Sequence, residues 1–424
     1  MASVAKRLLN GSAARTACAA AALWASPASA QLFSADAVEL SGDVRIVAAT
    51  GEKSWLKGGF GKLRGSGGGD DIRVRPELGN VDLVWKPQLT WSLSATIVGS
   101  VQGGAHAQAG LSQAFLTFRP MRGDKLAFSA RVGLMWPAIS LEHEGADWHV
   151  RDSITPSAIN SWIGEEVKPV AIEGTVATEI GASKLRATGA LMAANDTAGT
   201  LLTFRGWALH DRATLASNSQ PLPPLGDLAG YQAPYTHPTI DVRHGFAHRI
   251  GYYAKLAWQP PIPVRIELFR YDNRADPREV NDATEWGWDT QFNDLGLVAE
   301  LGGGAELKAQ AMQGRTRMGY AMDGRRWLDN RFRSAFVMLT HPVGEIGLAA
   351  RAEAFDTRHR GSLWDDEYDE HGWSAMLAAK REWGPLTGLV ELLHVWSDTP
   401  AREYADEPAR QKQTQLQAEV RMRW

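Results

Sequence analysis

The sequence has very little cysteine. Among 424 residues there is one, Cys18, near the N-terminus. A chain without a cysteine pair forms no internal disulfide, and it lacks the thiolates of most structural zinc sites. After the N-terminal segment no apolar run approaches the roughly 20 residues that a membrane-spanning helix needs. The formal net charge is only -3, which gives no broad field for binding nucleic acid, so we expect no nucleic-acid partner.

Common catalytic signatures are also missing. No Gly-x-Ser-x-Gly elbow and no His-Glu-x-x-His pair occurs. His244 and His248 are four residues apart, but Gly245 disfavours a helix, so solvated loop histidines are the simpler interpretation. The acidic run 365–370 would suit a divalent cation, although a solvated loop explains it more simply. We therefore expect no catalytic residues, no metal and no cofactor.

The first 30 residues have the organisation of a secretory signal. Lys6, Arg7 and Arg15 are basic, and residues 16–24 form a short Ala-rich apolar run. Residues 27–30, Pro-Ala-Ser-Ala, provide the small side chains that signal peptidase requires. We expect cleavage after Ala30, which leaves residues 31–424 as one domain without cysteine.

The C-terminus alternates strictly between apolar and polar residues. In 415–424 every even position is apolar and every odd one is polar, and the chain ends on Trp424. The same period of two runs through 89–97, 126–136, 250–258, 264–268 and 346–354. Each segment has about the length that a tilted strand needs to cross hydrocarbon. Since open sheet edges cannot lie in lipid, these strands predict a closed barrel.

The connections between strands alternate in length. Short links rich in Gly and Pro lie at 86–88, 120–124, 181–183, 260–263, 302–304, 341–345 and 383–388. Long polar loops lie near 50–78, 101–110, 137–167, 195–249, 273–285, 316–330, 357–370 and 398–411. Eight loops and seven turns join sixteen strands. The pattern predicts an all-β fold: a transmembrane antiparallel β-barrel of about 16 strands, with short periplasmic turns and long extracellular loops.

Aromatic residues lie near the ends of these segments. Rings at these places suit the interfacial girdles of a membrane barrel, whereas tryptophans buried in a core are the alternative. The residues concerned are Trp85, Trp136, Tyr252, Trp258, Trp288, Trp373 and Trp396.

Signal, alternating strands, turn asymmetry and terminal Trp424 together resemble the general and phosphate-selective porins of Gram-negative bacteria. The resemblance covers the whole chain but rests on no local motif. It implies a passive channel for small hydrophilic solutes in the cell outer membrane, of a kind often found as homotrimers. Membrane lipid, lipopolysaccharide and the outer-membrane assembly machinery are the further partners implied, with Trp424 as the assembly signal.

A barrel of this size is wide enough for an aqueous lumen. Side chains on the polar face are the candidates for lining it, and basic ones outnumber acidic ones, which favours anions. The candidates are Lys125, Arg131, Lys184, Arg186, Lys255, Arg265, Glu267, Lys308, Arg351, Glu353 and Arg421.

Two long loops are candidates for narrowing the lumen. Residues 157–166, after Pro156, have the composition of a short helix, and 200–207 are too apolar for a solvated loop. Long loops of this kind fold inward and are often functional, so an eyelet and a simple cap both stay open. In 137–167 the candidate constriction residues are Glu142, Glu144, Asp147, Arg151, Glu165 and Glu166.

Two other functions stay open. Some outer-membrane barrels are hydrolases of the phospholipase kind, which need a serine, a histidine and a carboxylate or amide together. A structural or adhesive barrel with a blocked lumen is the other alternative.

Overall fold

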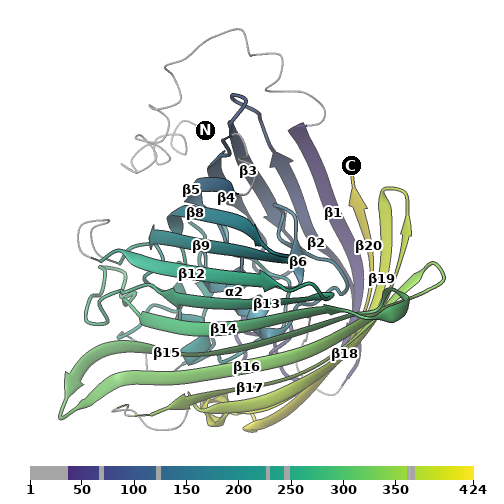
Figure 1. Ribbon diagram of the computed structural model, residues 1–424. Helices are drawn as coiled ribbons and strands as arrows, with labels where there is room; N and C mark the ends of the chain where they lie inside the picture. Colours follow the sequence, from purple (N-terminus) through teal and green to yellow (C-terminus); the bar gives the residue numbers. More distant parts are fainter. Residues whose placement is uncertain are drawn as a thin grey trace, which may run out of the picture.

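The computed structural model describes residues 37–65, 71–120, 126–225, 230–242, 249–360, 362 and 368–424. The expected signal peptide lies outside them, as do Lys125, His244 and His248. The described chain forms a closed barrel of sixteen strands, each antiparallel to its neighbours (Figure 1). The first and last strands close it by pairing Ser41 with Arg423 through to Ala49 with Gln415. The predicted fold class and strand number are confirmed.

The wall strands follow one another in chain order. They are β1 Val38–Ala49, β2 Arg73–Trp85, β3 Leu93–Gln102, β4 Gln108–Phe118, β5 Leu126–Leu134, β8 Val170–Ile180, β9 Ser183–Ala193, β12 Gly251–Gln259, β13 Val264–Asp272, β14 Asp289–Glu300, β15 Glu306–Met322, β16 Arg325–Val343, β17 Ile346–His359, β18 Glu370–Trp383, β19 Leu386–Asp398 and β20 Arg410–Arg423.

The outer face of this wall is apolar. Alternate residues along each strand point outward, and Leu268, Leu295 and Leu377 leave 52%, 48% and 60% of their surface exposed. A soluble protein does not expose apolar side chains in a continuous band, whereas a barrel in lipid requires one. The alternation read from the sequence therefore places the apolar face outside. Among the described residues, no helix combines the length and the apolar character needed to cross a bilayer.

Two long connections fold into the barrel. Residues 135–169, between β5 and β8, contain the hairpin of β6 His143–Glu144 and β7 His149–Val150, followed by α2 Ala158–Glu166. The described residues between β9 and β12, 194–225, 230–242 and 249–250, contain α3 Thr200–Phe204 and the pair β10 Gln220–Pro221 and β11 Tyr235–Thr236. In Figure 1, α2 lies within the ring of strands. The short 3-10 helices are η3 Trp55–Lys57, η6 Gly302–Gly304 and η8 Pro400–Ala405.

The helix predicted at 157–166 is confirmed as α2. Ser157 is its N-cap, and its hydroxyl accepts a hydrogen bond from the Asn160 N–H. All nine residues of α2 are buried, as are all five of α3. The apolar run at 200–207 therefore packs inside the protein, as predicted.

The prediction of a long loop at 316–330 is wrong. Strands β15 and β16 continue through it and join at Asp323-Gly324, where both residues have positive φ angles of 51° and 77°. This is the backbone of a tight two-residue hairpin turn, for which Asp-Gly is a preferred pair. In Figure 1 this hairpin extends beyond its neighbours. Its polar residues occupy strands that project from the wall.

Aromatic girdles are only partly found. Trp258 and Trp373 are 44% and 45% exposed on the outer face. Trp136 and Trp288 are almost fully buried in the interior, at 2% and 0% exposure. For these two, the alternative of a core tryptophan is correct, because their segments end where the chain turns into the barrel.

Candidate lumen site

The centre of the barrel is filled by aromatic packing. The ring of Trp162, from α2, lies 5.3 Å from Phe292 on β14 and 5.2 Å from Phe332 on β16, centre to centre. Trp207, from the second inward segment, contacts Trp162 at 6.0 Å with its ring nearly perpendicular. Edge-to-face pairs at these distances are favourable. The two inward segments thus share one core with the wall.

Carboxylates fasten the first inward segment to the opposite wall. Glu142 accepts hydrogen bonds from Arg351 on β17, at 2.7 Å, and from Asn160 at 2.6 Å. Burial would raise the pKa of Glu142, but Arg351 and the hydrogen bonds from Ser157 and Asn160 outweigh it and hold the pKa below its usual value. Glu142 and Arg351 are fully buried, so each is the counter-ion that makes the other's burial tolerable.

Two wall carboxylates bind the backbone of the same segment. Glu353 on β17 accepts the N–H of Ala158 at 2.8 Å, at the start of α2. Glu391 on β19 accepts the N–H groups of Ile154 and Thr155 at 2.7 and 2.9 Å. A negative charge at a helix N-terminus also interacts favourably with the helix dipole. The position of α2 is thereby fixed from the wall.

Basic wall residues hold the hairpin that precedes α2. Asp152 lies between Lys308 on β15 and Lys380 on β18, at 3.1 and 3.0 Å. Burial opposes ionisation of Asp152, yet the lysines and Arg151 lower its pKa to about 2. Asp147 contacts Arg423 near the end of β20 at 2.7 Å.

The last turn of α2 binds the second inward segment. Glu165 pairs with Arg205 at 2.7 Å and is hydrogen-bonded to His210 at 3.0 Å. Burial opposes ionisation of Glu165, but Arg205 and the contacts with His210 lower its pKa to about 2. Glu166 accepts hydrogen bonds from the N–H groups of Gly199 and Leu201, at 3.0 and 2.9 Å. Burial without a cationic partner nevertheless raises the pKa of Glu166 to about 7.

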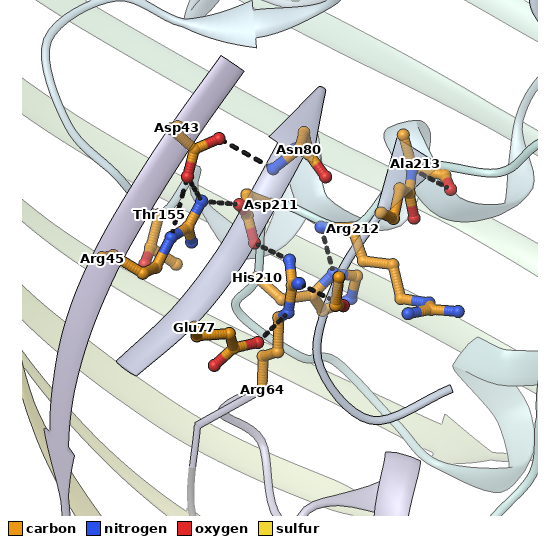
Figure 2. Close-up of polar contacts among 12 residues, drawn as sticks. Asp43, Arg45, Arg64, Glu77, Asn80, Thr155, His210, Asp211, Arg212 and Ala213 are labelled. Carbon is orange, nitrogen blue, oxygen red and sulfur yellow. Dashed lines mark hydrogen bonds and ion pairs between the residues drawn. The ribbon is translucent and has the colours of Figure 1, made fainter. Parts of the chain in front are cut away.

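An arginine-rich cluster lies beside β1, β2 and β20 (Figure 2). Asp211, from the second inward segment, binds Arg45 on β1 at 2.7 Å and Arg64 at 2.9 Å. Burial would raise the pKa of Asp211, but the two guanidinium groups hold it well below its usual range. Arg45 also contacts Asp43 and Glu419, at 2.5 and 3.1 Å.

Small polar cavities remain around these contacts. One of about 40 Å³ is lined by Asp43, Asp147 and Arg423 among others, and one of about 10 Å³ by Arg64 and Gln415 among others. Both also border Arg45 and Asp211. A single water needs roughly 10–15 Å³, so the smaller space is about the size of one water and the larger one has room for only a few.

The predicted lining residues that the structure describes all lie on the inward register of their strands, but their surroundings differ. Lys308, Arg351 and Glu353 are buried under the inward segment and face no open water. Arg131 pairs with Glu173, and Lys255 with Glu267. Lys184, Arg186 and Arg265 are exposed, and Arg421 binds Glu419. Lys125 lies outside the described residues.

The predicted constriction residues also divide into buried and exposed ones. Glu142, Asp147, Glu165 and Glu166 hold the inward segments together and to the wall, as described above. Glu144 and Arg151 pair with each other at 3.1 Å with about half their side-chain surface exposed. Among the described residues there is no cluster of three or more potential metal ligands.

Sequence reasoning missed the cluster around Asp211. Arg45 was detectable, because it occupies a polar position in the alternating segment that became β1. Arg64 and Asp211 lie in irregular segments 147 residues apart, and no periodic signal marks either.

Comparison with solved structures supports the fold. The outer membrane channel DcaP of Acinetobacter baumannii superposes with a TM-score of 0.50 at 13% identity, over 91% of this chain and 97% of that one. An anion-selective porin from Comamonas acidovorans gives 0.48 at 12% identity, over 91% and 99%. A loop-deletion mutant of the Vibrio cholerae outer membrane protein OmpT gives 0.49 at 9%, also over 91% and 99%. No protein-family profile matches the sequence. No curated protein matches it either. The likeness to the DcaP channel, at 13% identity, shows a porin-like barrel fold and nothing further.

Proposed function

We propose that this protein is an outer-membrane porin of a Gram-negative bacterium, a passive channel for small hydrophilic solutes with a lean toward anions. The observation that carries the proposal is the closed sixteen-strand wall, apolar outside and lined with charged residues inside. A wall of this size encloses more space than its own side chains fill. The remaining space is occupied by two inward segments, which would set the width of the route.

The contacts that attach these segments to the wall favour a channel whose lumen the segments narrow. Beside the aromatic core, some of their contacts to the wall are ion pairs with a partly exposed member, such as Asp147 with Arg423. Charged groups of this kind can exchange partners with water and ions, whereas a purely apolar plug cannot.

A barrel with a blocked lumen is the second candidate. The aromatic contacts of Trp162 with Phe292 and Phe332 favour it, because they cross the middle of the barrel. A conducting route would then have to run beside this core.

A hydrolase has weaker support. Ser140 Oγ lies 2.9 Å from His143 Nδ1, but the same oxygen accepts the N–H groups of Glu142 and His143 at 3.1 Å each. This is the geometry of a local turn. His143 also stacks on Trp148 at 4.5 Å, so its ring is held in packing, and we propose no catalytic role for it.

The export route and assembly belong to the same proposal. Residues 1–30 would direct secretion and be removed. Trp424 is 82% exposed at the end of β20 and so is available to the assembly machinery. The apolar outer wall would contact membrane lipid and lipopolysaccharide, and a homotrimer would bury part of it.

Single-channel recording tests the proposal. Purified, folded residues 31–424 would be added to a planar bilayer in a salt gradient. We expect discrete conductance steps and a reversal potential on the anion-preferring side. Folded protein that inserts but gives no steps would favour the blocked barrel, and phospholipid hydrolysis by the same sample would favour the enzyme.

A further inference from the structure

The two small cavities on the β1 side meet at one ion pair. Along β1, Ser41 and Asp43 border the cavity nearer the chain ends, and Val47 borders the other. Arg45, between them, borders both, as does Asp211. The Arg45–Asp211 contact therefore separates two polar spaces that follow one line along the wall, away from the aromatic centre around Trp162.

Asp211 bridges two arginines from different elements. Its Oδ2 contacts Arg45 Nη2 and its Oδ1 contacts Arg64 Nη1, as Figure 2 shows. The side chain of Asp211 is 12% exposed, and those of Arg45 and Arg64 are 4% and 6% exposed. One carboxylate thus occupies a place where two guanidinium groups converge.

The charges of this network balance only if Asp211 is counted. Ion pairs connect four arginines with four carboxylates; without Asp211 the remainder is four against three, a surplus of one positive charge. The members are Arg45, Arg64, Arg75, Arg421, Asp43, Glu77, Glu419 and Asp211.

The backbone that carries Asp211 is fixed on both sides. The N–H of Leu209 donates to the Lys62 carbonyl at 2.9 Å, and the N–H of Thr214 donates to the Gly164 carbonyl at 2.8 Å. Gln102 on β3 donates to the carbonyl of Ala213 at 2.9 Å. A change at Asp211 that leaves these contacts in place is therefore confined to its side chain.

We propose that Asp211 closes the route along the β1 wall and sets its ion preference. While its carboxylate bridges Arg45 and Arg64, the cavities are separate and both guanidinium groups are paired with it. When the carboxylate turns away, the cavities join and the uncovered positive charge attracts a small anion. The inference about ion preference rests on the proposed channel function, whereas the inference that Asp211 closes the route does not.

The recording compares the wild type with Asp211→Asn in a potassium chloride gradient. Asp211→Asn keeps the shape but removes the charge, so we expect larger current and a reversal potential shifted toward that of chloride. Asp211→Glu, which keeps the charge, retains the wild-type preference. Glu52→Gln is the matched control, because it removes a buried carboxylate that pairs with Arg402 at 2.9 Å and borders neither cavity. Channels of Asp211→Asn that match the wild type and Glu52→Gln would overturn the inference.

A second measurement separates closure from conduction. The sole cysteine of the chain is Cys18, in the expected signal, so Gln415→Cys places one thiol at the smaller cavity. We expect a water-soluble thiol reagent to label the double variant Gln415→Cys/Asp211→Asn about tenfold faster than the single variant Gln415→Cys. The reason is that loss of one charge-assisted contact changes an equilibrium by about that factor. Faster labelling without any conductance would support closure by Asp211 while the channel function fails. Equal labelling rates would overturn the closure itself.

Discussion

Two acidic side chains of the inner wall act as hydrogen-bond acceptors for the first inward segment. Glu353 and Glu391 bind backbone N–H groups between residues 154 and 158, and Arg351 binds Glu142 from the same segment. Buried charges are tolerated only when they are paired in this way. These contacts favour one position of the segment over others.

Loss of the Glu142 carboxylate would test this. In Glu142→Gln, Arg351 keeps its charge but loses its nearer carboxylate partner, and only Glu353, at 3.5 Å, remains paired with it. We expect the free energy that holds α2 in place to fall by about 3 kcal/mol, the usual cost of breaking a buried pair. Amide hydrogen exchange of residues 158–166 measures this.

Glu144→Gln is the control for that variant. Glu144 is half-exposed and its pair with Arg151 is at the surface, so exchange within α2 should change by less than about 0.5 kcal/mol. Similar loss of protection in both variants would mean that the Glu142–Arg351 pair does not hold α2.

The residue scale also marks the limit of sequence reasoning. The period of two correctly put Arg351 and Glu353 on one inward face, because it follows from strand geometry alone. It could not show that Glu142, 209 residues away, lies over Arg351. Contacts between an irregular segment and a distant strand leave no periodic trace in the chain.

At the scale of elements, local signals decided which predictions succeeded. Ser157 after a proline gave the start of α2, and the apolar run 200–207 gave the buried α3. The region 316–330 was misread because β15 and β16 leave the wall there and carry polar residues on both faces. Asp323-Gly324 was the signal of a tight hairpin that would have corrected it.

The contact between α2 and α3 gives a pH prediction. The pKa of Glu166 is about 7 in the folded protein against an ordinary value of 4.5. The folded state therefore binds more protons between these values, so stabilisation present below about pH 4.5 is lost as the pH rises through 7. The loss is about 3 kcal/mol at most. We expect Glu166→Gln to abolish this slope in amide exchange of residues 199–205.

Two comparisons make that test specific. Glu165 has its pKa lowered to about 2, so its stabilisation is lost only at much more acid pH and does not contribute to this window. Glu382→Gln alters a carboxylate whose side chain is 67% exposed and should keep the wild-type slope. A slope that persists in Glu166→Gln would assign it to another group.

At the scale of the whole molecule, we expect two cooperative parts in one barrel. The wall is held by sixteen antiparallel ladders, whereas the interior depends on the packing of the inward segments around Trp162. Each ladder is made by backbone groups of two neighbouring strands, and those hydrogen bonds do not involve the inward segments. The interior is therefore able to loosen while the wall persists, as a gated channel requires.

Trp162→Ala separates the two parts. Removing this ring leaves a cavity between Phe292, Phe332 and Trp207, at a cost of about 3–5 kcal/mol to the interior packing. We expect the near-ultraviolet circular dichroism of the aromatic core to melt at a lower temperature, while the far-ultraviolet β-sheet transition stays in place. In Trp383→Ala, which removes a ring 49% exposed on the outer face, the core should melt as in the wild type. If Trp162→Ala lowered both transitions equally, wall and interior would form one cooperative unit, and movement of the inward segments would require opening the barrel itself.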